Sequence, residues 1–333
     1  MSNTFCRLVS KITLALILVS SIIYTFSQSL ETQALGSFNP ERVFPGVLDK
    51  LPSALSSPSL INAYLAGKNS FLANYKITIG FEPNDTLVGP NTFSGKPVYL
   101  KPRETVQSPW GGKTMSVGEF IFRLSVDDFG NSCNLDVRFN DTCINNRKRI
   151  INPAFIIALI QKESGLIYGS NAQRNPNDSG TQFLIDRATG YLCLETQDKS
   201  KSCWDENPNW KFFKGFFRQV YYGVRFLRLW EQVCESGGPY FTNSNGVFKV
   251  GNTVKIRNDA FQFQDYTLRD GMTCAMAIYT PTIARGHFNI FKQIGGDVNL
   301  IDYKRQSFSN VPVGLPVVPT KPEEKVLFQT QKR

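Results

Sequence analysis

The sequence predicts a mainly α-helical protein whose helical core spans residues 111–300. Helix-start signals stand directly before apolar runs at Ser57, Ser116 and Asn152. Strand signals are few: "KPVYLKP" reads as a short strand, and its prolines confine it to a sheet edge. Residues 30–110 are rich in Pro, Gly, Ser and Asn, so we expect a loop-rich N-terminal segment that contains one helix.

The first two helices are predicted from their caps. Ser57 caps a helix over residues 57–75, and Pro58 suits its first turn. Ser116 and Glu119 have the spacing of a capping box ahead of "FIFRLSVDDF".

A third helix is predicted over "NPAFIIALIQKESG", with Asn152 as its cap and Gly165 as its stop. Helical spacing places four of its residues on one inward face: Ile156, Leu159, Ile160 and Glu163. Glu163 would then be partly dehydrated, and desolvation raises the pKa of a carboxyl group, as a general acid working near neutral pH requires. The alternative is an exposed glutamate at the helix end, held in a structural ion pair.

Two further helices are expected over residues 212–233 and 267–279. The first has an apolar stripe: Phe212, Phe216, Val220, Gly223, Leu227 and Trp230. Its aromatic and basic residues are typical of a packed core with a solvated cationic face, although aromatics beside cations also suit sugar rings or single-stranded nucleic acid. Residues 301–333 turn polar and then rich in Pro and Val, as in a flexible tail.

The N-terminus and the charge together indicate an exported protein. Arg7 and Lys11 precede an uncharged apolar run, residues 12–26, so residues 1–29 are predicted to be a signal peptide, or alternatively a retained membrane anchor. We therefore expect a periplasmic, cell-envelope or extracellular location. The formal charge of +10 favours a polyanionic neighbour such as nucleic acid, anionic lipid or an acidic cell-wall polymer. Export argues against nucleic acid and limits membrane contact to the N-terminal segment.

Six cysteines follow the apolar run, an even number that predicts disulfide bonds in an exported chain. The simplest arrangement pairs neighbours in sequence: Cys133 with Cys143, Cys193 with Cys203, and Cys234 with Cys274. A zinc site is the alternative, but the chain has no C-x-x-C and a single histidine, His287. That histidine reads as a surface or hydrogen-bonded residue rather than a catalyst. With no nucleotide-binding glycine pattern either, we expect no metal and no cofactor, and assign the chemistry to carboxylates.

Four motifs occur in a fixed order along the chain: "ALIQKESG", "RATGYLC", "QVYYGVRFLRLW" and "AMAIYTP". This order resembles the lysozyme-like domain of lytic transglycosylases and related bacterial muramidases, over about residues 50–295. The resemblance implies a catalytic Glu163 with Tyr279 beside it, and a substrate-binding set of Ser164, Thr189, Gly190, Tyr191 and Tyr222. The chain departs from the family pattern by lacking Leu-Met-Gln after Gly190 and by reading Tyr-Thr-Pro where the family has Tyr-Asn-Ala-Gly.

The resemblance implies a peptidoglycan-cleaving enzyme that protonates the oxygen linking N-acetylmuramic acid (MurNAc) to N-acetylglucosamine (GlcNAc). Its partners would be peptidoglycan glycan strands, with cell-envelope machinery as a further candidate. If a second carboxylate takes part, the candidates are Asp178 and Asp186, and both an anhydro and a hydrolysed product stay open. The alternatives are a lysozyme-like module that binds glycan without cutting it and, more remotely, an anchored nucleic-acid-binding protein.

Overall fold

The computed structural model describes residues 35–79, 89–91, 98–100, 112–126, 150–191, 213–236, 240–280 and 282–302. All of them belong to one compact unit, Leu35–Arg333. The predicted leader, the tail from residue 303, and the cysteines at positions 133, 143, 193 and 203 lie outside the described residues.

Helices dominate the described residues, and every sheet among them is a single antiparallel pair of strands. The α-helices are α2 (Pro58–Gly67), α3 (Val117–Ser125), α4 (Pro153–Ser164), α5 (Ser179–Asp186), α7 (Phe216–Ser236), α8 (Gly271–Tyr279) and α9 (Arg285–Ile294). The strand pairs are β1 (Leu51–Pro52) with β10 (Leu300–Ile301), β2 (Lys76–Thr78) with β5 (Thr114–Ser116), β3 (Gly89–Asn91) with β4 (Val98–Leu100), β6 (Phe241–Asn243) with β7 (Gly246–Phe248), and β8 (Thr253–Arg257) with β9 (Phe263–Thr267).

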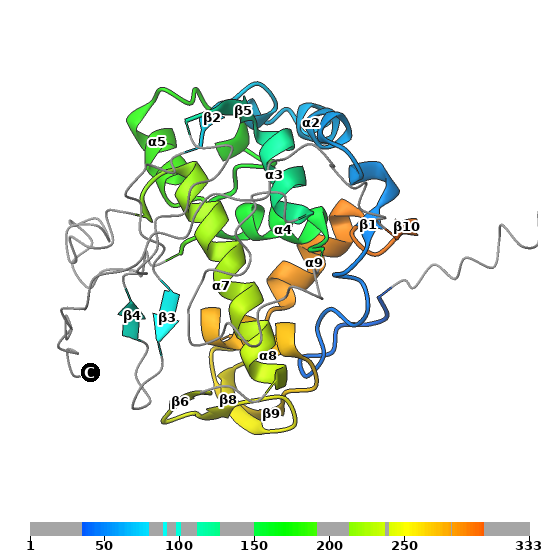
Figure 1. Ribbon diagram of the computed structural model, residues 1–333, viewed down its shortest axis with the longest axis vertical. Coiled ribbons are helices and arrows are strands. Elements are labelled where there is room, and N and C mark those ends of the chain that lie inside the picture. Colours follow the sequence, from blue (N-terminus) through cyan, green and yellow to red (C-terminus); the bar gives the residue numbers. More distant parts are fainter. Residues whose placement is uncertain are drawn as a thin grey trace, which may run out of the picture. The chain divides into compact units, whose positions relative to one another are not determined.

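Helix α4 lies in the middle of this arrangement, in contact with α3, α7 and α9 (Figure 1). Every residue from Pro153 to Ile160 is buried. The sequence had predicted one inward face, which is wrong for this part of the helix. A helix with apolar residues all round is a buried helix, because each side needs an apolar neighbour.

The helix caps form as the sequence predicted. The Ser57 hydroxyl accepts the Leu60 N–H at 3.3 Å, the Ser116 hydroxyl accepts the Glu119 N–H at 3.1 Å, and the Asn152 side-chain oxygen accepts the Ala154 N–H at 3.0 Å. Each bond satisfies a donor that the first helical turn leaves unpaired. The Glu119 carboxylate pairs with Arg123 at 2.8 Å.

Three predicted helices differ in extent from those observed, and one of them, expected over residues 212–233, runs from Phe216 to Ser236. The helix expected over residues 57–75 stops at Gly67, and Asn69 adopts a positive φ of 55° before a short 3-10 turn, Phe71–Ala73. The helix expected from residue 267 begins at Gly271, because the Asp270 carboxylate accepts the Thr273 N–H at 2.8 Å and so caps it there. Thr267 belongs to strand β9 instead.

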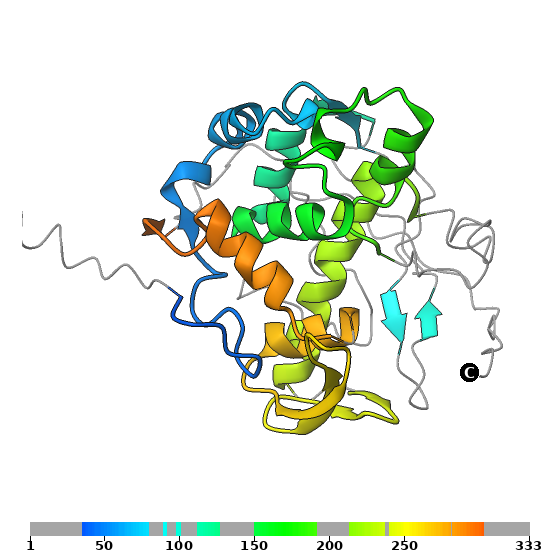
Figure 2. The same cartoon turned by 180° about the vertical axis from the view of Figure 1, so that it is seen from behind.

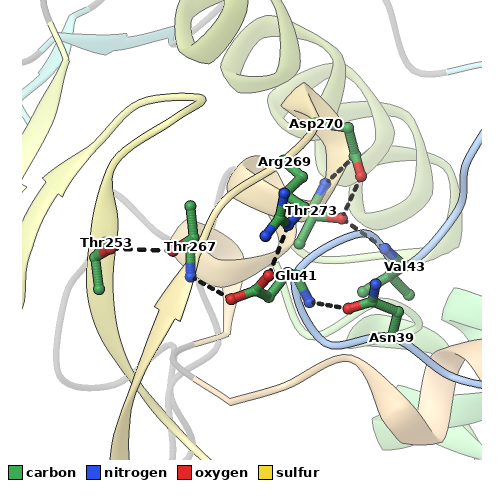
Figure 3. A network of polar contacts seen from close by, with 8 residues as sticks. All are labelled: Asn39, Glu41, Val43, Thr253, Thr267, Arg269, Asp270 and Thr273. Atoms are coloured by element: carbon green, nitrogen blue, oxygen red, sulfur yellow. Dashed lines mark hydrogen bonds and ion pairs between the residues drawn. The ribbon is translucent and has the colours of Figure 1, made fainter.

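The described N-terminal residues share one core with the helices. Phe44 packs edge-on against Phe155 of α4 and Phe291 of α9, with ring centroids 5.3 and 5.2 Å away. Polar contacts hold the same segment to the start of α8 (Figure 3): the Val43 N–H donates to the Thr273 hydroxyl at 2.9 Å, and Glu41 pairs with Arg269 at 2.6 Å. This segment is therefore part of the folded unit.

Hairpins β6–β7 and β8–β9 lie beside α8 (Figures 1 and 2) and cover a smaller apolar cluster. Val254 and Ile256 of β8 point into that cluster, whereas Thr253, Lys255 and Arg257, which alternate with them, are exposed. A disulfide between Cys234 and Cys274 joins α7 to α8 within it, with the two Cα atoms 6.3 Å apart. This is the pairing that sequence spacing proposed for the two cysteines.

Candidate functional site

Glu163 lies in the last turn of α4, where the buried helix reaches the protein surface. Gly165 ends the helix in the left-handed conformation, with φ 69°, and its N–H bonds the Gln161 carbonyl at 3.0 Å. The Glu163 side chain is 21% exposed, and its Oε1 lies 2.5 Å from Nζ of Lys162. One oxygen of this partly buried carboxylate, Oε1, is therefore paired with an ammonium group. The other oxygen, Oε2, is not part of that ion pair.

The turn after α5 supplies the surface that faces the second oxygen. Gly190 has a positive φ of 68°, and its N–H donates to the Arg187 carbonyl at 2.9 Å. A Cβ placed on Gly190 would lie 3.2 Å from Oε2 of Glu163. Glycine is favoured here for two reasons: the backbone conformation is one that L side chains rarely adopt, and the carboxylate approaches closely.

Buried side chains hold this turn against α4 and α7. The Ser164 hydroxyl donates to the Ile160 and Ala188 carbonyls at 2.8 and 2.9 Å, which ties the end of α4 to the turn. The Thr189 hydroxyl donates to the Gln219 carbonyl of α7 at 2.7 Å. The position of Gly190 is therefore fixed from both sides.

Tyr279 ends α8 beside the same turn. Its hydroxyl donates to the Thr189 carbonyl at 2.6 Å. Burial is the main cause that raises the pKa of Tyr279, and the negative charge of Glu163 raises it further, although the hydrogen bond to Thr189 opposes them. The phenol therefore stays a neutral hydrogen-bond donor across the physiological range.

Gly223 of α7 makes room for this contact. A Cβ at that position would lie 2.8 Å from the Thr189 hydroxyl and 3.3 Å from the Tyr279 hydroxyl. The four motifs singled out from the sequence thus come together: the end of α4, the 189–191 turn, Gly223 of α7 and the end of α8.

Exposure divides the predicted site residues into two groups. Glu163, Gly190 and Tyr279 are partly exposed. Ser164, Thr189, Tyr191 and Tyr222 are each at most 4% exposed.

These four buried side chains lie too deep for direct contact with a substrate, so the substrate-binding role predicted for them is corrected. The first three hold the turn. The Tyr222 ring packs in the core against Phe213, with centroids 5.2 Å apart.

The two candidate second carboxylates differ in their surroundings. Asp186 is 7% exposed, and its oxygens bind the Gln182 amide at 3.1 Å and the Lys214 ammonium at 3.2 Å. Asp178 is exposed at the N-cap position of α5. The Asp186 carboxylate is thus already used in holding α5 to the residues before α7.

His287 is buried beneath the site. Its Nε2 donates to the Phe155 carbonyl at 3.0 Å, and its ring lies against Phe44 and Phe155. Burial is the main cause that lowers the pKa of His287 to about 3, and the nearby charge of Lys162 contributes. The ring is therefore a neutral packing residue. Among the described residues, no group of three or more His, Cys, Asp or Glu side chains could hold a metal ion.

Sequence reasoning missed two residues of this region. Gln219 is fully buried, accepts the Tyr191 N–H at 3.0 Å and donates to the Tyr191 and Phe213 carbonyls. An amide inside an apolar helix was the available signal, because buried polar groups are normally hydrogen-bonded. Lys162 was visible next to Glu163, but only the structure shows that its ammonium contacts the carboxylate.

Comparison of the sequence with family models and with curated proteins, and of the structure with solved structures, found no match. Within the described residues, no helix combines the length and the apolar character needed to cross a membrane.

Proposed function

We propose that the protein is a lysozyme-like, peptidoglycan-cleaving glycosidase that acts on the β-1,4 bond between MurNAc and GlcNAc, with Glu163 as general acid and base. The observation that carries the proposal is the meeting of Glu163, Gly190 and Tyr279 from three distant segments. The fold needs no carboxylate at the end of this buried helix, so a chemical role accounts for it best.

The chemistry requires two proton transfers at Glu163, one from the carboxyl group and one back to it. Protonated Glu163 donates its proton to the glycosidic oxygen, the bond between that oxygen and C1 of MurNAc breaks, and the bonding electrons leave with the oxygen. The acetamido group of MurNAc stabilises the resulting oxocarbenium-like sugar. The Glu163 carboxylate then removes a proton either from the C6 hydroxyl, whose oxygen bonds C1 and gives an anhydro sugar, or from water, whose oxygen bonds C1 and gives an ordinary reducing end.

The site supports the anhydro product better. A two-carboxylate mechanism needs an ionised carboxylate that faces the sugar. Asp186 is engaged by Gln182 and Lys214, so it is a poor candidate for that role. We therefore propose the single-glutamate route of lytic transglycosylases, in which Oε2, the oxygen that faces Gly190, exchanges the proton.

One observation favours a second function, a lysozyme-like module that binds glycan without cutting it. The Lys162 ammonium contacts Oε1 of Glu163 at 2.5 Å, so one oxygen of the proposed catalytic carboxylate is already held in an ion pair. A module of this kind would use the same surface and bind the polymer without releasing fragments.

Release of soluble fragments from dye-labelled sacculi separates the two functions. The enzyme proposal expects release by the wild type and none by Glu163→Gln. Glu119→Gln is the matched control, because Glu119 is also a partly buried helix glutamate paired with a cation, and it should keep full activity. Asp178→Asn should also stay active if one glutamate suffices. Binding without release by folded wild type would contradict the enzyme proposal and favour the binding module.

A further inference from the structure

The tip of the β8–β9 hairpin exposes two phenylalanines. Phe261 is 73% exposed and Phe263 is 49% exposed, the two highest values among the large apolar side chains of the described residues. The Arg257 guanidinium lies 5.1 Å from the centre of the Phe263 ring. Neighbouring exposed aromatics of this kind mark surfaces that bind other molecules.

The fold holds Phe261 in a conformation that does not suit a phenylalanine. Its φ is +58°, a region that glycine adopts freely and bulky residues rarely enter. Asn258 fixes the loop: its side-chain oxygen accepts the Ala260 and Gln262 N–H groups at 2.9 and 3.0 Å, and its own N–H donates to the Gln262 carbonyl at 2.8 Å. A strained and exposed aromatic is unfavourable for stability on both counts, which points to a role outside folding.

The base of the hairpin is firmly attached, so the tip is preorganised. Figure 3 shows the Thr253 and Thr267 hydroxyls bonded across the two strands at 3.1 Å. The Thr267 N–H donates to the Glu41 carboxylate at 3.0 Å, and Glu41 also pairs with Arg269. A partner that binds the tip would therefore not have to order it first.

The tip end of the hairpin lies near the end of α8 that carries Tyr279. Arg257 forms a bridge with Thr282, and its carbonyl accepts the Ile283 N–H at 2.9 Å. Thr282 follows Tyr279 by three residues. The tip end of the hairpin is therefore bonded to the residues that directly follow α8.

A second set of contacts leads from the tip to Glu163 itself. Asp259 pairs with Arg285 of α9, Oδ2 to Nε, at 2.5 Å. The next residue, Gly286, approaches Lys162, since a Cβ on it would lie 4.0 Å from Cε of that lysine. Lys162 contacts Glu163. Contacts thus connect the phenylalanine tip to the proposed catalytic carboxylate through the start of α9.

The groups around the two rings indicate the partner. The exposed charged side chains beside them are three cations, Lys255, Arg257 and the Arg285 that pairs with Asp259, and two carboxylates, Asp259 and Asp265. The amides of Gln262 and Gln264 are exposed as well. A net charge of about +1, with both signs interspersed, does not form the positive patch that an anionic lipid surface or a nucleic acid needs. Aromatic faces beside amides suit a sugar chain, which offers apolar C–H faces and neutral hydroxyls.

We propose that the tip of the β8–β9 hairpin, with Phe261 and the Phe263–Arg257 pair, is a second glycan-binding point for the same polysaccharide strand whose linkage lies at Glu163. The strand would extend from Glu163 past the start of α9 to the two rings, so the protein would prefer long strands to short fragments. The identity of the polymer rests on the proposed function, whereas binding at the tip is measured separately from cleavage.

The test measures binding of the full-length Glu163→Gln protein to purified peptidoglycan sacculi by sedimentation. In that background, Phe261→Gly should weaken binding roughly tenfold, because it removes one aromatic contact. The same substitution should raise the midpoint of thermal unfolding by about 2 °C, since glycine relieves the left-handed strain. A more stable protein that binds less tightly rules out misfolding as the cause.

Two controls match the substitution. Asn69→Gly relieves a similar positive φ of 55° elsewhere, and Leu60→Gln removes an exposed apolar side chain, 41% exposed, from α2. Neither should change sacculus binding. Unchanged binding of Phe261→Gly, an equal loss in the controls, or a loss confined to phosphatidylglycerol vesicles would overturn the proposal. Tip-dependent binding by a wild type that releases no fragments would support the glycan contact and contradict only the enzymatic function.

Discussion

The end of α4 and the tip of the β8–β9 hairpin expose side chains of opposite character, although in both regions an amide side chain fixes the adjacent loop. Helix α4 is apolar and ends in a carboxylate, whereas the hairpin tip is polar and presents two exposed aromatic rings. In each case one amide side chain fixes the neighbouring loop: Gln219 holds the 189–191 turn, and Asn258 holds the 258–262 loop. The difference lies in burial, since Gln219 is fully buried and Asn258 is only partly so.

The proposed roles of the two regions differ in the precision of side-chain placement that they require. The buried amide fixes a turn against Glu163, and the proposed bond cleavage would need such precise positioning. The hairpin loop needs only to present an aromatic surface for binding. Helix α9 joins the two regions, because Arg285 pairs with Asp259 of the hairpin and His287 bonds the Phe155 carbonyl of α4.

The largest expected effect separates catalysis from binding. Glu163→Gln should lower the rate of fragment release by about a thousandfold, in the range that loss of a general acid and base produces, while sacculus binding persists. Initial release rates and sedimentation on the same preparations check this. A parallel loss of both properties would mean that the two regions do not act separately.

A glycine pair tests whether the turn must fit the carboxylate. Gly190→Ala and Gly112→Ala impose similar strain, since their φ angles are 68° and 71°, but nothing lies within 4 Å of a Cβ on Gly112. Both should lower the free energy of unfolding by about 1 kcal/mol. Only Gly190→Ala should also lower activity, roughly 10- to 100-fold, because it displaces Glu163. Equal activities in the two variants would contradict this account of the site.

The loss of folding stability at acid pH should report on His287, the residue that bonds α9 to the Phe155 carbonyl of α4. The folded state keeps His287 neutral down to about pH 3, whereas the unfolded state takes up the proton below about pH 6.5. Stability is therefore lost as the pH falls between these values, by about 1.4 kcal/mol per pH unit.

Urea unfolding at pH 7 and pH 5 measures this loss. His287→Gln keeps an N–H donor for the Phe155 carbonyl and has no proton to gain. The wild type should lose about 2 kcal/mol more than this variant over that interval. Equal losses would mean that His287 does not titrate as its burial implies.

The smallest effect concerns the tyrosine hydroxyl. Tyr279→Phe removes the 2.6 Å bond to the Thr189 carbonyl and should cost about 1 kcal/mol of stability, with activity lowered about fivefold. Tyr266→Phe of the hairpin loses an exposed hydroxyl that bonds Gln264 at 2.9 Å, so it should change neither property. Stability is read from urea unfolding and activity from fragment release. A larger effect from Tyr266→Phe would contradict the assignment of Tyr279 to the site.

The sequence predicted what depends on local interactions. The caps at Ser57, Ser116 and Asn152 and the stop at Gly165 each depend on residues within one turn, and all four form. The meeting of Glu163, Gly190 and Tyr279 was predicted from the order of the motifs. The all-round burial of α4 was not predicted, although its unbroken apolar run from Phe155 to Ile160 is consistent with it.

What the sequence reading missed depends on tertiary packing or on weak patterns. The alternation in "TVKIR" is the sequence signal for β8, but one short alternating run is weak evidence for a strand by itself. Tyr222 and Tyr279 are both tyrosines near a motif, and only the packing of α7 buries the first while α8 brings the second to Glu163. The Lys162 contact likewise depends on a side-chain conformation.

Mass spectrometry of the fragments released from purified peptidoglycan tests the central claim most directly. The account predicts that the wild type releases muropeptides lighter by one water than ordinary reducing-end fragments, and that Glu163→Gln releases none. Ordinary reducing ends would contradict the single-glutamate route and require a second carboxylate. No soluble fragment from folded wild type, on walls of several types, would contradict the enzymatic function itself.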